Sequence, residues 1–264
     1  IMTGGMATIA GGVLAAYIGF LGGDSPESRQ LFAKHLLSAS VMSAPAAIVM
    51  AKILVPETET PETQGGAEIQ DTEEADNVIE AAANGASDGL RLALNVGAML
   101  LAFLALIGTI NAGFEWVGAP VVYGVELYNV NELVAQASGG RFDALSLEAV
   151  FGFLFAPLAW AMGVGAADIL QFGTLLGEKV AVNEFVAYAS LRDLQGALSE
   201  RSMIIGTYAL CGFANFSSIA IQIGGLGGIA PSRKSEIAAL GLRAVLGGAL
   251  ASWLTATVAG VLVA

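Results

Sequence analysis

The chain has 264 residues, of which 55% are hydrophobic, 13% are charged and 34 are glycine. Soluble domains carry about 25% charged residues, so this composition indicates an integral membrane protein rather than a soluble domain. Of the 23 acidic residues, ten lie between Glu57 and Asp88, where no Lys or Arg occurs; this acidic loop argues against a nucleic-acid partner, which needs a basic surface.

Residues 1–23 form the first uncharged run. A helix needs about 20 residues to cross the roughly 30 Å hydrocarbon core, so this run is long enough to span a membrane. Its Gly4, Gly5, Gly11 and Gly12 each weaken a helix by about 1 kcal/mol relative to Ala, which predicts a broken helix. No charged n-region or cleavage site precedes the run, so we do not interpret it as a signal peptide. We expect instead a fragment of a longer protein, cut within a helix.

Residues 35–51 form a second candidate span between Lys34 and Lys52, whose side chains can reach the interface from the helix ends. Pro45 within this run predicts a kink. His35, the only histidine, lies at the edge of the run. Both an interfacial His and a role in proton coupling are open for it.

The middle of the chain reads as a loop, an interfacial helix and a span. Residues 56–75 are polar and acidic, which predicts a mobile loop. Residues 78–90 place apolar side chains at helical spacing, typical of an amphipathic helix on the membrane surface. This helix leads into residues 93–114, which are uncharged and predict a spanning helix. For residues 115–147 we expect short interfacial helices after a break at residues 118–120.

The last third contains two segments that suit a cavity better than lipid. Residues 149–167 are apolar, and residues 168–191 alternate apolar and polar groups. Irregular or polar backbone at membrane depth must be buried in protein or line a cavity, so we predict a re-entrant helical hairpin with its tip near residues 179–184. Residues 202–230 are uncharged but polar at their centre, which predicts two half-helices joined by an unwound segment. Residues 244–264 form the final span.

A weak internal repeat links the two ends of the chain. Residues 5–11 align with residues 212–218, so that Thr8 falls opposite Asn215, and each copy is followed by glycines, a Ser-Arg loop and another apolar run. Paired, interrupted hydrophobic segments are typical of transporter repeats and their binding site. We therefore predict an all-α integral membrane transporter with inverted repeats, a re-entrant helical hairpin and discontinuous helices.

The predicted organisation has four parts. These are the second part of a first repeat (residues 1–55), the acidic loop and interfacial helix (56–91), a scaffold span with linking helices (92–164), and a second repeat (165–264).

Two stretches resemble a known family. Gly177-x-Lys179-x-x-x-Asn183-Glu184-Phe185-Val186-Ala187-Tyr188 matches the signature of the concentrative, sodium-coupled nucleoside transporters, and residues 208–219 match their second hallmark stretch. The likeness covers essentially the whole chain, as the family's C-terminal portion. The family's first hairpin, which carries a Gly-Gln-Thr-Glu-like motif for the nucleobase, has no counterpart here and would lie before Ile1.

The resemblance implies a homotrimer that moves nucleosides with sodium across the plasma membrane, or across the inner membrane of a bacterium, without enzymatic activity or an organic cofactor. By motif, Glu184, Asn215 and Ser218 would bind the ribose, with Asn183 and Phe213 beside them. The Thr8 hydroxyl and the Ile9 carbonyl would contribute sodium ligands. Chemistry supports the ribose assignment, because an ionised carboxylate is acceptor-only and can accept from both vicinal hydroxyls.

Each of these residues also has a purely structural interpretation. Glu184 could pair with Lys179, which we assign to a structural or gating ion pair. Asn215, Ser217 and Ser218 could serve only to join helices. Thr8 could hydrogen-bond back to its own helix, and Phe213 and Tyr188 could be core aromatics.

Other functions remain as alternatives. Proton-coupled nucleoside transport with Glu184 as the proton carrier is one, and a non-transporting membrane bundle is another. The chain has no His-Glu-x-x-His, no Gly-x-Ser-x-Gly and no second His, so a membrane-embedded hydrolase has little support.

Overall fold

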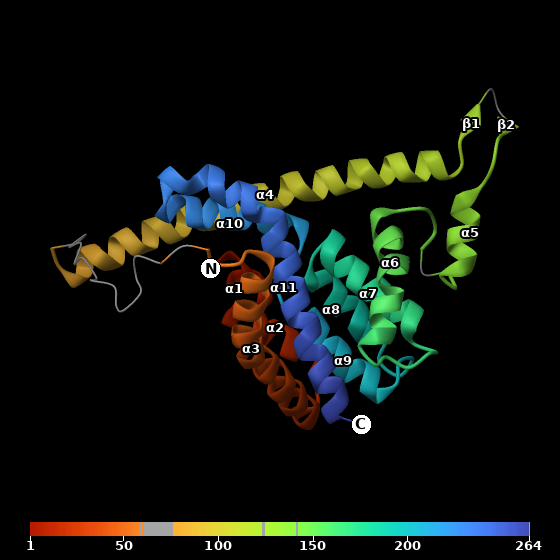
Figure 1. Ribbon diagram of the computed structural model, residues 1–264, viewed down its shortest axis with the longest axis horizontal. Helices are drawn as coiled ribbons and strands as arrows, with labels where there is room; N and C mark the ends of the chain where they lie inside the picture. Colours follow the sequence, from red (N-terminus) through yellow and green to blue (C-terminus); the bar gives the residue numbers. More distant parts are fainter. Residues whose placement is uncertain (59, 61–75, 123–124, 141, 264) are drawn as a thin grey trace.

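The computed structural model describes residues 1–58, 60, 76–122, 125–140 and 142–263; at residues 92, 95–97, 99–100, 103–104, 122 and 125–126 it describes the backbone alone. The described chain is helical, as predicted, apart from an antiparallel ribbon of two short strands (Figure 1). The elements are α1 (Met2–Ala7), α2 (Gly11–Gly22), α3 (Pro26–Leu54), α4 (Val78–Gly118), β1 (Val121–Val122), β2 (Val125–Glu126), α5 (Val130–Ala137), α6 (Leu147–Ala161), α7 (Ile169–Ala181), α8 (Glu184–Asp193), α9 (Glu200–Leu210), α10 (Phe216–Ile229), the 3-10 helix η1 (Pro231–Arg233) and α11 (Lys234–Leu262).

The first broken helix is α1 and α2, separated by residues 8–10, which confirms the interruption predicted for residues 1–23. Gly23 has φ +55, a left-handed conformation that suits glycine, and it ends α2. The next helix, α3, begins at Pro26 and contains Pro45. It starts well before the predicted residue 35, because Ser25 caps it by accepting a 3.3 Å hydrogen bond from the Ser28 N–H.

The second broken helix is α9 and α10, separated by residues 211–215, which confirms the predicted pair of half-helices. As in the first case, a short turn and a long helix follow, here η1 and α11. Helix α11 packs against both α1 and α3, so the two broken-helix units lie side by side (Figure 1). Glycine makes this approach possible: a Cβ on Gly212 would lie 3.0 Å from the Ala7 carbonyl oxygen.

Helices α7 and α8 form the predicted hairpin, with its tip at residues 182–183. At about 1.5 Å per residue they are about 20 and 15 Å long, so neither can cross a 30 Å core alone. At the open end of the hairpin, Asp168 joins the start of α7 to the start of α9. Its Oδ2 accepts hydrogen bonds from the Ser199 hydroxyl (2.7 Å) and the Ser199 N–H (3.2 Å). Burial raises the pKa of Asp168, but hydrogen bonds from Ser202 and Ser199 outweigh it and lower the pKa overall.

Helix α6 supports the hairpin from outside, antiparallel to α7. A Cβ on Gly177 would lie 2.6 Å from the Gly152 nitrogen and 2.7 Å from the Glu148 carbonyl oxygen. The two helices therefore touch backbone to backbone, an approach that only small residues allow.

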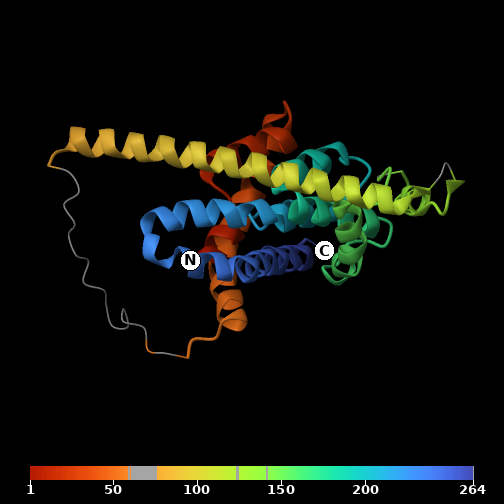
Figure 2. The same cartoon turned by 90° about the horizontal axis from the view of Figure 1, so that it is seen from above.

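The long helix α4 joins the two segments predicted separately as an interfacial helix and a span. It continues unbroken for 41 residues, about 60 Å, along the length of the molecule and beside α10 (Figure 2). It ends at Gly118, at the predicted break. Of the predicted short helices that follow, α5 is present, and the two short strands β1 and β2 precede it. The acidic loop lies largely outside the described residues.

Among the described residues, three helical stretches are long and apolar enough to cross a membrane: Met2–Gly22, Pro26–Leu54 and Pro231–Leu262. Exposed Val41, Ile48 and Ile53 lie along α3, which suits contact with lipid or protein rather than water. The buried core lies between the two broken helices, the hairpin and α11.

Candidate functional site

Glu184 lies at the tip of the hairpin as the first residue of α8. Asn183 caps this helix, because its Oδ1 accepts a 2.9 Å hydrogen bond from the Val186 N–H. Only 2% of Glu184 is exposed. A carboxylate in such a position is stabilised by the partial positive charge of the helix N-terminus.

Both oxygens of Glu184 accept a hydrogen bond from a distant part of the chain. The Tyr17 hydroxyl on α2 donates to Oε1 at 3.0 Å, and Asn215 Nδ2 donates to Oε2 at 3.1 Å. The carboxylate therefore connects the hairpin tip to both broken helices.

Asn215 caps α10, and its side-chain oxygen is fully engaged. Oδ1 accepts from the Ser217 hydroxyl at 2.7 Å, and from the Ser218 N–H and hydroxyl, each at 2.8 Å. The Ser218 N–H can only donate, so the oxygen of the Asn215 amide must face it and the Nδ2 group faces Glu184. The two serines thus bond within their own segment, and Asn215 alone of the three crosses to the hairpin.

Lys179 does not pair with Glu184, contrary to one interpretation of the sequence. Its buried Nζ donates to the Ala209 carbonyl at 2.7 Å and to Ser252 Oγ at 2.8 Å. Ala209 lies in the last turn of α9, where the carbonyl groups carry partial negative charge. The expected ion pair at Lys179 is therefore replaced by hydrogen bonds that join α7 to α9 and α11.

Thr8 and Ile9 lie in the break of the first broken helix, where sodium ligands were predicted. The Thr8 hydroxyl donates to Ser40 Oγ at 3.4 Å instead of bonding back to its own helix. Within the described part of the chain, no hydrogen bond ends on the Thr8 or Ile9 carbonyl oxygen.

The remaining residues that the sequence singled out lie at different distances from this network. Phe213 is half-buried in the break before α10, two residues from Asn215. His35 is half-buried and lies 3.3 Å from the Tyr208 hydroxyl, away from Glu184's partners. Tyr188 donates to the Thr207 carbonyl at 2.7 Å. Tyr17 was missed, because a single aromatic in a glycine-rich run carries no local pattern that points to Glu184.

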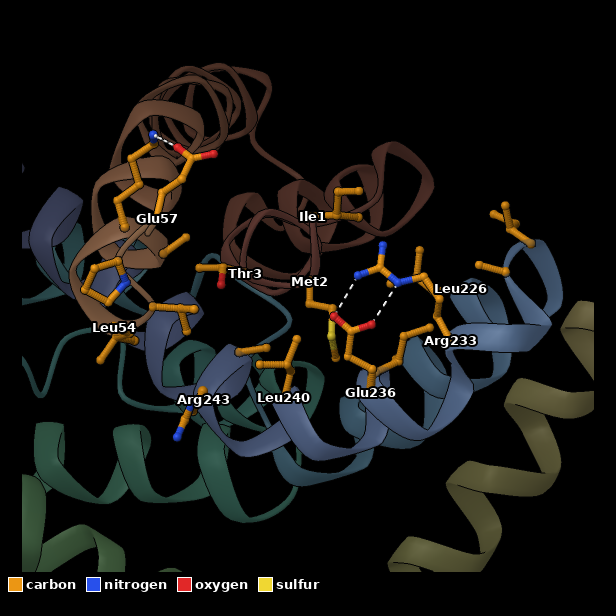
Figure 3. A pocket seen from close by; sticks show the side chains of 18 residues that line it. Ile1, Met2, Thr3, Leu54, Glu57, Leu226, Arg233, Glu236, Leu240 and Arg243 are labelled. Atoms are coloured by element: carbon orange, nitrogen blue, oxygen red, sulfur yellow. Dashed lines mark hydrogen bonds and ion pairs between the residues drawn. The ribbon is translucent and has the colours of Figure 1, made fainter. Parts of the chain in front are cut away.

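Two cavities of the described structure lie elsewhere. One, of about 710 Å³, is lined by apolar side chains such as Met2, Leu54 and Leu240 and by the ion pair Arg233–Glu236 (Figure 3). The other, of about 450 Å³, borders the outer face of the hairpin at Val182 and Val186. Neither contains Glu184 or Asn215, which are enclosed by their protein partners.

Comparison of this sequence with known proteins identifies the family to which the chain belongs. Residues 35–260 match the family model described as "Na+ dependent nucleoside transporter C-terminus". The chain belongs to this family of transporters. It is 44% identical over 264 residues to an uncharacterized transporter, YutK, of Bacillus subtilis (strain 168), covering 100% of this chain and 58% of that protein. It is 41% identical over 278 residues to solute carrier family 28 member 3 of Mus musculus, covering 99% of this chain and 36% of that protein.

Solved structures agree with this assignment. CNTnw in an inward-facing substrate-bound state matches with a TM-score of 0.68 and 39% identity, over 99% of this chain and 56% of that one. A variant of CNTnw in the intermediate 3 state matches with a TM-score of 0.76 and 39% identity, over 99% and 57%. The chain therefore spans a little over half of the length of its bacterial relative and of these solved chains.

Proposed function

We propose that this chain forms the C-terminal part of a secondary transporter that carries nucleosides into the cell together with sodium. The single observation that most supports this function is the buried carboxylate of Glu184, a residue of the family signature. This carboxylate accepts hydrogen bonds from Tyr17 and Asn215. In this proposal the protein resides in the plasma membrane, or in the inner membrane of a bacterium. It works as a homotrimer in contact with lipid.

In this proposal Glu184, Asn215 and Ser218 bind the ribose, with Phe213 and Asn183 beside them. A carboxylate has about four lone-pair sites, of which protein donors use two here. The other two match the two donors of a vicinal diol. Each hydrogen bond to a charged group contributes about 1.5–3 kcal/mol, so this interaction supplies a large part of the sugar's affinity.

Sodium would enter at the break between α1 and α2, where the Thr8 hydroxyl and the Ile9 carbonyl contribute oxygen ligands. Unwound helix segments coordinate coupling ions in other transporters with broken helices. One charge moving inward through 100 mV releases about 2.3 kcal/mol, and a tenfold sodium gradient adds about 1.4 kcal/mol. Together these could concentrate a nucleoside by several hundredfold.

Transport would proceed by movement of the two broken-helix units and the hairpin (residues 1–55 and 165–264) past a scaffold formed by residues 92–164. The packing of α1 and α3 against α11 supports grouping the two broken-helix units, and α6, within residues 92–164, is the element that packs closely against the hairpin helix α7.

The test is uptake of radiolabelled uridine into proteoliposomes that contain the full-length protein. We expect accumulation that depends on an inward sodium gradient and is abolished by replacing sodium with potassium. Uptake indifferent to sodium but driven by an inward proton gradient would instead support proton coupling through Glu184, and the absence of saturable uptake would support a non-transporting bundle.

Two variants test whether Glu184 contributes to the uptake measured in this assay. Glu184→Gln replaces an acceptor oxygen by an NH2 donor that faces Tyr17 or Asn215, and we expect uptake to fall by at least about tenfold. Glu148→Gln is the matched control, because Glu148 also accepts hydrogen bonds from an asparagine amide, that of Asn111 at 2.8 and 3.1 Å. If both variants transport like the unaltered protein, Glu184 does not bind the solute.

A further inference from the structure

Tyr17 is the residue of the first broken helix that reaches the proposed sugar site. Its side chain is fully buried on α2, and its hydroxyl donates to Glu184 Oε1 at 3.0 Å across 167 positions of sequence. Neither of the two signature stretches includes it.

The ring of Tyr17 is held in place by other aromatic rings. It stacks on Tyr188 with centroids 4.2 Å apart, and it contacts Phe185 at 6.3 Å and Phe20 at 6.5 Å. Because the ring is held on several sides, its hydroxyl has one direction available, toward Glu184. The Tyr188 hydroxyl points elsewhere, to the Thr207 carbonyl.

Glu184 accepts one hydrogen bond at each of its two carboxylate oxygens. Asn215 Nδ2 bonds one oxygen, and the amide cannot exchange its two ends because the Ser218 N–H, which can only donate, holds its Oδ1. Tyr17 bonds the other oxygen. With both oxygens engaged, the plane of the carboxylate is fixed, and so are the directions of its remaining lone pairs.

We propose that Tyr17 is a positioning residue that sets the selectivity for the sugar: it aims the Glu184 carboxylate at a pair of vicinal hydroxyls. The inference rests on the proposed function. A site built for two hydroxyls discriminates against an analogue that lacks one, because an acceptor is left unpaired. A carboxylate free to rotate can satisfy a single hydroxyl as well as a pair, so discrimination between ribose and 2′-deoxyribose depends on Tyr17.

The test compares KM for uridine and 2′-deoxyuridine in the full-length protein in proteoliposomes. Tyr17→Phe retains the ring and removes only the hydroxyl. We expect its KM for uridine to rise about tenfold, KM for 2′-deoxyuridine to change less, and the ratio of the two constants to approach one. Tyr188→Phe, which removes the neighbouring hydroxyl of the same stack, keeps the ratio of the unaltered protein.

A double-variant experiment separates positioning from packing. In a Glu184→Gln background, Tyr17→Phe should change equilibrium binding of uridine, measured by calorimetry in detergent, by less than about twofold, because the carboxylate it aims is gone. An unchanged ratio in Tyr17→Phe, or an equal loss of binding in both backgrounds, overturns the inference. Failure of the unaltered protein to take up uridine would instead count against the proposed function.

Discussion

Asn215 Nδ2 and Glu184 Oε2 lie 3.1 Å apart and join the N-terminus of α10 to the N-terminus of α8. The buried carboxylate is thus stabilised by hydrogen bonds and by helix N-termini, without a direct ion pair to Lys179. The nearest buried lysine in sequence, Lys179, bonds the end of α9 instead.

Ser217→Ala should weaken uridine binding moderately. The change removes one of three donors that orient the Asn215 amide, and a neutral hydrogen bond contributes about 0.5–1.5 kcal/mol, so we expect a two- to about tenfold higher Kd. Calorimetry on the purified full-length protein measures it. Ser43→Ala, which removes a buried hydroxyl bonded to the Ser40 carbonyl, is the control and should bind normally.

Thr8→Val should raise the sodium concentration needed for half-maximal uptake, by about two- to tenfold, because it removes one proposed oxygen ligand while keeping the shape of the side chain. Thr8→Ser should restore most of the sodium affinity. Thr109→Val serves as the control, since the Thr109 hydroxyl bonds the Ala105 carbonyl of its own helix. Equal sodium dependence in all three proteins would remove Thr8 from the ion site.

Gly177→Ala should destabilise the contact between α6 and α7. Its Cβ would lie 2.6 Å from the Gly152 nitrogen, so backbone must move. Such overpacking costs about 1–3 kcal/mol, which lowers Tm by about 2–10 °C in a thermal melt in detergent. At Gly19 an added Cβ meets nothing within 4 Å, so Gly19→Ala should melt at or slightly above the temperature of the unaltered protein.

Asp168→Asn should loosen the open end of the hairpin in a pH-dependent way. The hydrogen bonds from Ser199 and Ser202 lower the pKa of Asp168 despite its burial. The ionised carboxylate therefore contributes stability above the ordinary Asp pKa of about 3.9, and this contribution is lost as pH falls through the lower folded value. We expect the variant to melt below the unaltered protein at pH 7, with the two curves converging below about pH 4. A gap that persists at low pH would contradict this account.

Much of the architecture follows from local sequence. Glycines and polar residues in otherwise uncharged runs predict that the helices of residues 1–23, 168–191 and 202–230 are broken, because regular helix there would bury polar groups or lack packing. The structure places the breaks at residues 8–10, 182–183 and 211–215. The turn before Pro26 and the end of α4 at Gly118 follow from proline and glycine chemistry in the same way. The change in composition at residues 91–93 predicts an interfacial helix followed by a span. Because no helix breaker occurs there, the two form one continuous helix, α4.

By itself, then, the sequence determined that this is a membrane chain with two broken helices and a hairpin whose tip carries a carboxylate. Only the tertiary structure decided what that carboxylate touches. Tyr17 is 167 positions from Glu184, and Lys179 bonds Ala209 and Ser252 instead of the acid five residues along its own chain. The physical reason is that breaks and caps depend on neighbouring residues, whereas hydrogen-bond partners depend on which helices pack together.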